Sequence, residues 1–64
     1  MYRRNAPGKI IAARVTTYSD SGQVMAHIEW EGGATTSGDP ANGHMAALLA
    51  RAEREGLTIV REVW

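Results

Sequence analysis

"SGDPANGHMAALLARAEREG", residues 37–56, is the stretch that decides the fold, because the spacing of its apolar residues becomes helical. Its apolar side chains fall within about 100° of arc on a helix of 3.6 residues per turn, enough for one buried stripe. The stripe consists of Ala41, Met45, Leu48, Leu49 and Ala52. Gly56 follows at the C′ position, where glycine commonly ends a helix. The stretch therefore predicts one amphipathic helix.

The entry to this helix has two capping alternatives. Asp39 is the N-cap if Pro40 is the first helical residue, whereas a later start makes Asn42 the cap. The glycines and the positive end of the helix dipole would also let an anion approach. Phosphate loops normally add a lysine, however, and no Lys or Arg lies between Glu31 and Arg51. We interpret the segment as a helix start.

The residues before the helix read as three strands. "KIIAARVTTYS", residues 9–19, is rich in the β-branched and aromatic residues typical of strands. "QVMAHIEW", residues 23–30, alternates strictly. One face carries Val24, Ala26, Ile28 and Trp30, and the other carries Gln23, Met25, His27 and Glu29. After the turn residues 31–33, "ATTSG" predicts a short polar third strand, and "LTIVREVW", residues 57–64, predicts a fourth.

These elements predict an α+β fold, a β-β-β-α-β two-layer sandwich. It is an antiparallel meander with one helix packed on one face and a C-terminal fourth strand parallel to the first, in sheet order 3-2-1-4. Residues 1–8 are expected to form a basic N-terminal arm and residues 9–64 a single domain. The predicted core consists of Ile11, Val15, Val24, Ala26, Ile28, Trp30, Met45, Leu48, Leu49 and either Ile59 or Val60.

Composition gives no sign of an enzyme or of a cofactor. The 64 residues include no cysteine, which excludes disulfides, thiolate metal sites and thiol catalysis. No serine lies in a nucleophile-elbow motif. His27 and Glu29 share a strand face, but His44 belongs to a helix expected on the opposite face, so no metal site is predicted. We expect a non-enzymatic protein.

Charge and hydropathy bear on location and partners. No apolar run approaches the length of a membrane helix, and "MYRRNAPGK" is not followed by an apolar signal-type region, so we expect a soluble cytoplasmic protein without membrane contact. The formal net charge is zero. Residues 1–14 nevertheless hold four basic residues and no acid, whereas residues 15–64 hold three basic residues and seven acids.

The sheet face away from the helix is the predicted binding surface. A protein partner would contact this face and the C-terminus, through Arg14, Tyr18, Met25, His27 and Trp64. Thr16 and Glu29 belong to the same face, and packing of Trp64 under the helix is the alternative for that residue. Self-association into a homodimer is a further option, because a chain this small buries only about 60% of its unfolded surface. The alternative function is nucleic-acid binding through Arg3, Arg4, Lys9 and Arg14.

"TTSGDPANGHMAALLARAEREGLTIVREVW", residues 35–64, resembles the C-terminal half of short uncharacterised accessory proteins from phages and mobile elements of GC-rich bacteria. The similarity rests on the general character of residues 43–56 and carries no catalytic or binding residues with it. It implies a small product that acts by stoichiometric binding in a bacterial or phage-infected cell, for example as an inhibitor of a host defence complex of the anti-CRISPR kind. Many such inhibitors are strongly acidic, so this neutral chain would act instead by masking a protein surface.

Overall fold

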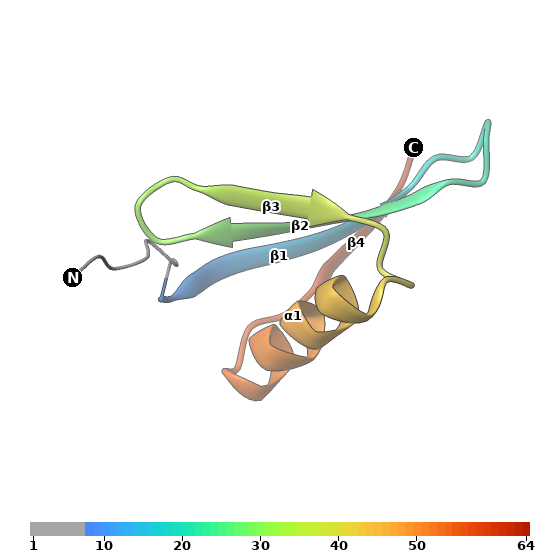
Figure 1. The fold of residues 1–64 in the computed structure, drawn as a ribbon. Coiled ribbons are helices and arrows are strands. Elements are labelled where there is room, and N and C mark those ends of the chain that lie inside the picture. Colours follow the sequence, from blue (N-terminus) through green and yellow to red (C-terminus); the bar gives the residue numbers. More distant parts are fainter. Residues whose placement is uncertain (1–7) are drawn as a thin grey trace.

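The fold is one four-stranded sheet with a single helix against one of its faces (Figure 1). The computed structural model describes residues 8–64. The elements are β1 (Ile10–Thr17), β2 (Val24–Trp30), β3 (Thr35–Gly38), α1 (Gly43–Arg54) and β4 (Val60–Val63). The α+β class, the element order and the placing of the helix are as the sequence predicts. The predicted arm, residues 1–8, lies outside the described residues except for Gly8.

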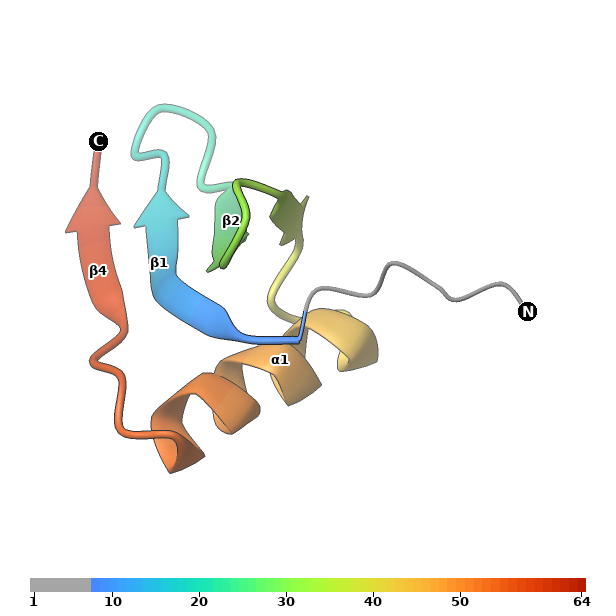
Figure 2. The ribbon, with the colours of Figure 1, turned by 90° about the vertical axis from the view of Figure 1, so that its left-hand side faces the viewer.

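The sheet has the predicted strand order, β3-β2-β1-β4. β2 is antiparallel to both β1 and β3, and β4 is parallel to β1 (Figure 2). A right-handed crossover through a helix is the usual way to return a chain to a parallel neighbour, which is why the helix precedes β4. β3 and β4 are therefore the two edges of the sheet.

A β-bulge near the start of β1 changes which isoleucine is buried. Ile10 pairs with Trp30 but Ala12 pairs with Glu29, so β1 holds one residue more than β2 across this interval. The extra residue breaks the alternation of faces. Ile10 is consequently 2% exposed, whereas Ile11 is 50% exposed. The prediction of Ile11 in the core is wrong, and Ile10 takes that place.

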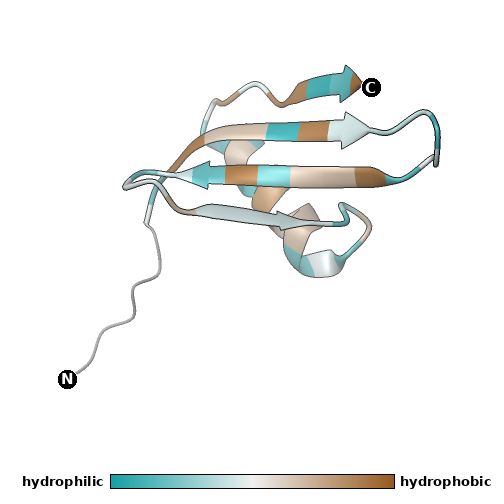
Figure 3. Cartoon of the chain, turned by 90° about the horizontal axis from the view of Figure 1, so that it is seen from above, coloured by the Kyte–Doolittle hydropathy of each residue, from teal (hydrophilic) through white to brown (hydrophobic). Residues whose placement is uncertain are grey.

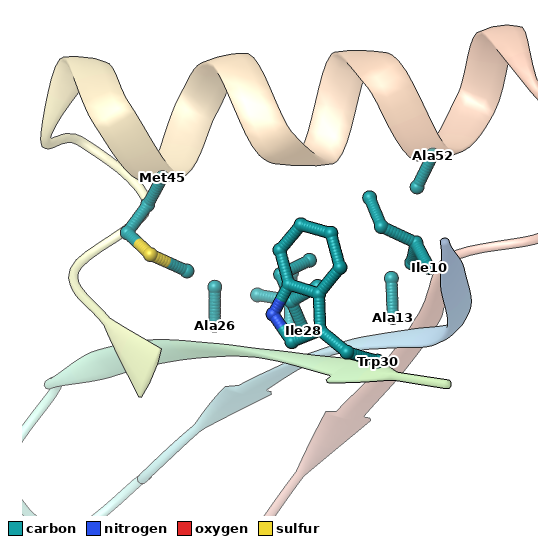
Figure 4. Packing of buried hydrophobic residues seen from close by; sticks show 8 residues of the cluster. Ile10, Ala13, Ala26, Ile28, Trp30, Met45 and Ala52 are labelled. Atoms are coloured by element: carbon teal, nitrogen blue, oxygen red, sulfur yellow. The ribbon is translucent and has the colours of Figure 1, made fainter. Parts of the chain in front are cut away.

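The core lies between α1 and the facing side of β1 and β2 (Figure 4). Its buried hydrophobic residues are Ile10, Ala13, Val15, Ala26, Ile28, Trp30, Met45 and Ala52. Val24, Leu48, Leu49, Leu57 and Ile59 pack against this cluster and are partly buried. Of the two candidates in the last strand, Ile59 supplies the core contact, because Val60 is exposed on the other face. Ala41 precedes the helix and is exposed, so it does not belong to the buried stripe.

Trp30 connects the helix to the sheet through its buried ring. Its indole Nε1 donates to Thr36 Oγ1 on β3 at 2.8 Å, which satisfies the polar edge of a ring that is 6% exposed. The Arg51 guanidinium carbon lies 5.5 Å from the ring centroid, within the range of a cation–π contact. Arg51 is also paired with Glu55, one turn later, at 2.9 Å. The aromatic side chain thereby joins α1 to both β2 and β3.

Both ends of α1 are capped by local chemistry. Asn42 is the N-cap, with its side-chain oxygen accepting from the backbone N–H of His44 at 2.9 Å. Asp39 instead closes the preceding turn, accepting from the N–H of Ala41 at 2.8 Å. At the C-terminus, Gly56 has φ of +91° and the Leu57 N–H donates to the Ala52 carbonyl at 3.0 Å, a Schellman arrangement. The predicted C′ glycine is confirmed, and the later of the two N-terminal starts is the one adopted.

Among residues 8–64, no helix combines the length and the apolar character needed to cross a membrane.

Candidate functional site

The sheet face opposite α1 is left uncovered by the described residues, and we call it the open face (Figure 3). Strand register places the side chains on it. Arg14 pairs with His27 on β2 and with Val60 on β4, while Thr16 pairs with Met25 and Glu62. The open face comprises Arg14, Thr16, Tyr18, Met25, His27, Glu29, Val60, Glu62 and Trp64. The five side chains predicted to bind a protein partner thus lie on one surface.

A chain of polar contacts joins β1 to β4 at one side of this face. The Arg14 Nε lies 3.8 Å from Glu62 Oε1, and the Trp64 Nε1 donates to the same oxygen at 3.2 Å. The Arg14 side chain is 48% exposed, so the ion pair is solvated and contributes little to stability. Glu62 Oε1 thus contacts both the Arg14 guanidinium and the Trp64 indole on this face.

Trp64 lies at the end of this chain of polar contacts and is 68% exposed. Its ring meets Tyr18 edge to face, with centroids 6.0 Å apart and planes at 72°. The backbone fixes it further, since its N–H donates to the Thr17 carbonyl and its carbonyl accepts from the Ser19 N–H, both at 2.8 Å. Packing of Trp64 under the helix is therefore wrong. The open face carries an aromatic pair, in which Trp64 is exposed and Tyr18 is half-buried.

Thr16 lies in the middle of the open face and is nevertheless 2% exposed. It is flanked in register by Met25 and Glu62, both half-buried, whose longer side chains stand on either side of it. The face is consequently nearly flat, because the short Thr16 side chain at its centre lies between longer side chains on β2 and β4. Flat surfaces of this kind suit a macromolecular partner better than a small ligand, which needs a concave pocket.

His27 links the open face to β3 by a side-chain hydrogen bond. Its Nδ1 and the Ser37 Oγ of β3 share a hydrogen bond of 2.9 Å. Ser–His pairs act in acyl transfer when an acid orients the ring and backbone donors stabilise the oxyanion. Within residues 8–64, the hydrogen bonds of the His27 ring include no carboxylate partner. This pair supplies a polar patch to the surface.

The histidines and carboxylates do not converge on a metal position within the described residues. His27 is on the open face, whereas His44 lies in the first turn of α1, on the other side of the sheet. Glu29 follows His27 by two residues and is exposed. Two ligands on the face of an inner strand cannot by themselves complete a tetrahedral or octahedral shell.

The basic residues predicted for nucleic-acid binding are only partly described. Arg3 and Arg4 lie outside residues 8–64, Lys9 is exposed just before β1, and Arg14 is on the open face. On that face, Arg14 is the only Lys or Arg of the nine residues that define it, against the two carboxylates Glu29 and Glu62. The formal charge of the face is therefore −1, which does not attract phosphates.

Sequence reasoning missed Val60 and Glu62 as members of the open face. The last strand has apolar residues at both parities, so alternation does not assign its faces. The signal that does so is the pairing with β1, which sets Val60 beside Arg14 and Glu62 beside Thr16. Charge complementarity between Arg14 and Glu62 is the one trace of this pairing in the sequence.

Comparison with known proteins gives no match for this chain among family models, curated proteins or solved structures.

Proposed function

We propose that this chain is a small non-enzymatic protein–protein interaction module that contacts its partner through the open face and Trp64. The observation that carries the proposal is the exposed Trp64, which contacts the half-buried Tyr18 beside a sheet face that α1 does not cover. Aromatic residues, Met and Arg are enriched in protein interfaces, and the face offers all three. Its mixed charges, one arginine and two glutamates, favour a partner with a polar surface of both signs.

The resemblance of residues 35–64 to phage and mobile-element accessory proteins suggests a biological setting. There, such a module would occupy a surface of a host protein complex and inhibit or modulate it, in the manner of anti-defence proteins including anti-CRISPRs. A flat recognition face supports masking of a protein surface, because it presents a broad area without a catalytic pocket. The setting would be the cytoplasm of a bacterial or phage-infected host cell.

Nucleic-acid binding remains the second candidate, favoured by exposed Lys9 and by the basic residues of the segment before it. Phosphate neutralisation supplies most of the affinity in nonspecific binding. Glu29 and Glu62 oppose it on the open face, so nucleic acid would have to bind chiefly through Arg3, Arg4 and Lys9.

Site-specific photocrosslinking tests the protein-binding proposal. A photoreactive phenylalanine analogue replaces Glu29, which is exposed on the open face, and in a matched control replaces Ala47, which is exposed on α1. In a bacterial lysate we expect a discrete protein adduct from position 29, suppressed by excess unlabelled wild type, and no such adduct from position 47. Identical products from both positions, or none from position 29, would contradict the proposal.

A gel-shift assay separates the two candidates. The chain is incubated with mixed-sequence DNA and RNA at about 50 mM and about 200 mM salt, a range over which phosphate-dominated binding weakens strongly. We expect no micromolar complex. A complex that weakens with salt and is lost when Arg3, Arg4 and Lys9 become alanine would favour nucleic-acid binding instead.

A further inference from the structure

The outer edge of β4 presents free backbone hydrogen-bonding groups. β1 is the only strand that neighbours β4 in the sheet of the described residues. The Trp64 N–H and C=O both bond to the β1 side, through Thr17 and Ser19. Because these groups alternate in direction along a strand, those of Arg61 and Val63 point away from β1. An extended strand is the structure that satisfies such groups.

The side chains of β4 protect this edge only in part. Natural edge strands are blocked by lysines and other charged side chains, by prolines, by bulges or by short length. β4 is short and carries Arg61 and Glu62, but it has no lysine, proline or bulge, and its register with β1 is regular from Arg14 to Thr17. Val60 is 48% exposed and Val63 is 75% exposed, on opposite faces of the strand. The opposite edge, β3, has the polar sequence Thr35–Gly38. β4 is therefore the edge at which pairing would bury apolar surface.

We infer that β4 pairs antiparallel with β4 of a second copy of this chain, about a two-fold axis perpendicular to the sheet. Such a pairing is isologous and makes one continuous sheet with both helices on the same side. The outward-facing residues Ile59, Arg61 and Val63 must then form the hydrogen-bonded pairs. This inference concerns self-association and does not depend on the partner proposed for the open face.

The side chains distinguish the possible registers. With Arg61 opposite its own copy, Ile59 of each chain lies opposite Val63 of the other, so an apolar pair flanks the centre on both sides. Ile59 already packs against the core, and its contact with Val63 would join the two cores across the axis. In the register centred on Glu62, this side chain would face its own copy at a Cα separation of about 4.5 Å, where like charges repel. The register centred on Val60 pairs Ile59 with Arg61 and loses the contact between Ile59 and Val63.

A second copy fits this edge because the edge is self-complementary. In this register the exposed Val63 of each copy lies directly opposite the half-buried Ile59 of the other. Arg61 is the cost of the pairing, since two guanidinium groups lie at the centre, but they occupy the wider type of pair, at about 5.5 Å between Cα atoms, and extend into solvent. Replacing Arg61 with threonine should therefore tighten the dimer.

Proline substitution tests the pairing without disturbing the chain's own sheet. Val63→Pro removes an N–H that points away from β1, and proline is tolerated at edge positions of that kind. Thr35→Pro is the matched control at the other edge. The Trp30 N–H donates to the Ala34 carbonyl at 2.9 Å, so the Ala34 groups face β2 and the Thr35 N–H points outward.

Sedimentation is measured from about 1 µM to about 100 µM, which brackets a micromolar dissociation constant. We expect wild type and Thr35→Pro to shift from one chain to two. Val63→Pro should raise the dimer dissociation constant at least tenfold at an unchanged melting temperature, and Arg61→Thr should lower it. A wild type that stays a single chain throughout, or a folded Val63→Pro that dimerises like wild type, overturns the inference.

Amide hydrogen exchange in the wild type tests the pairing without any substitution that could disturb the fold. The Arg61 and Val63 amides should exchange several-fold more slowly at high than at low protein concentration, while the outward Thr35 amide should not change. Dimerisation without this slowing at Arg61 and Val63 would place the interface elsewhere and overturn the inference.

Discussion

Because of the bulge in β1, Ile10 and Ile11 contribute unequally to the free energy of unfolding. Replacing each of them with valine measures the difference. Ile→Val removes one methylene, worth about 0.8 kcal/mol when fully buried. At Ile10, 2% exposed, the cavity left behind brings the expected loss of unfolding free energy to about 0.5–1.5 kcal/mol. At Ile11, 50% exposed, half the burial gives roughly 0.4 kcal/mol and no enclosed cavity. Ile10→Val should therefore destabilise the chain two- to threefold more than Ile11→Val.

Urea denaturation followed by circular dichroism provides the assay. With a slope of about 1 kcal/mol per molar urea for a chain of this size, Ile10→Val should lower the midpoint by about 1 M and Ile11→Val by about 0.4 M. The alanine variants widen the gap, because Ile→Ala in a core costs about 2–5 kcal/mol and total stability is only about 3–10 kcal/mol. Ile10→Ala should therefore lose a large part of the unfolding free energy, whereas Ile11→Ala should lose much less. An equal or larger loss at Ile11 would refute the bulge.

Two further outcomes test the helix ends and the tryptophan anchor. Gly56→Ala should cost about 1–2 kcal/mol, because alanine is strained at φ of +91°, whereas Gly43→Ala, at negative φ with open space around it, should be neutral or stabilising in the same thermal melts. Trp30→Phe removes the hydrogen bond to Thr36. In a double-mutant cycle, the cost of Trp30→Phe should be about 1 kcal/mol lower in a Thr36→Val background than in the wild type. An equal cost in both backgrounds would mean that this hydrogen bond contributes no stability.

The fold could be predicted from the sequence wherever a pattern allowed only one interpretation. Residues 23–30 alternate between apolar and polar side chains except at Met25, which assigns the faces of β2, and Gly56 marks the end of α1. β1 begins with two isoleucines, so hydropathy does not distinguish the buried one, and the bulge that decides between them depends on pairing with Trp30. The N-cap was ambiguous for a similar reason, since Asp39 and Asn42 both have capping side chains.

The candidate site was predictable on β1 and β2 and incomplete on β4. Arg14, Tyr18, Met25 and His27 follow from alternation in the two central strands. The orientation of Trp64 depends on Glu62 and Tyr18, contacts made across 46 residues of chain in the latter case, from 18 to 64. Local periodicity contains no information on contacts of that separation.

The dimensions of the two layers explain why apolar residues remain exposed at one end of this sheet. A 12-residue helix is about 18 Å long and about 10 Å wide, whereas four strands span about 14 Å and the eight residues of β1 extend about 26 Å. The helix therefore covers about half of one face. Figure 3 shows it running obliquely behind the middle of the sheet, with the end of β4 beyond it. Val63 is on the helix side yet 75% exposed for this reason. Within residues 8–64 nothing covers this side chain, so any contact that buries Val63 has to come from outside this range.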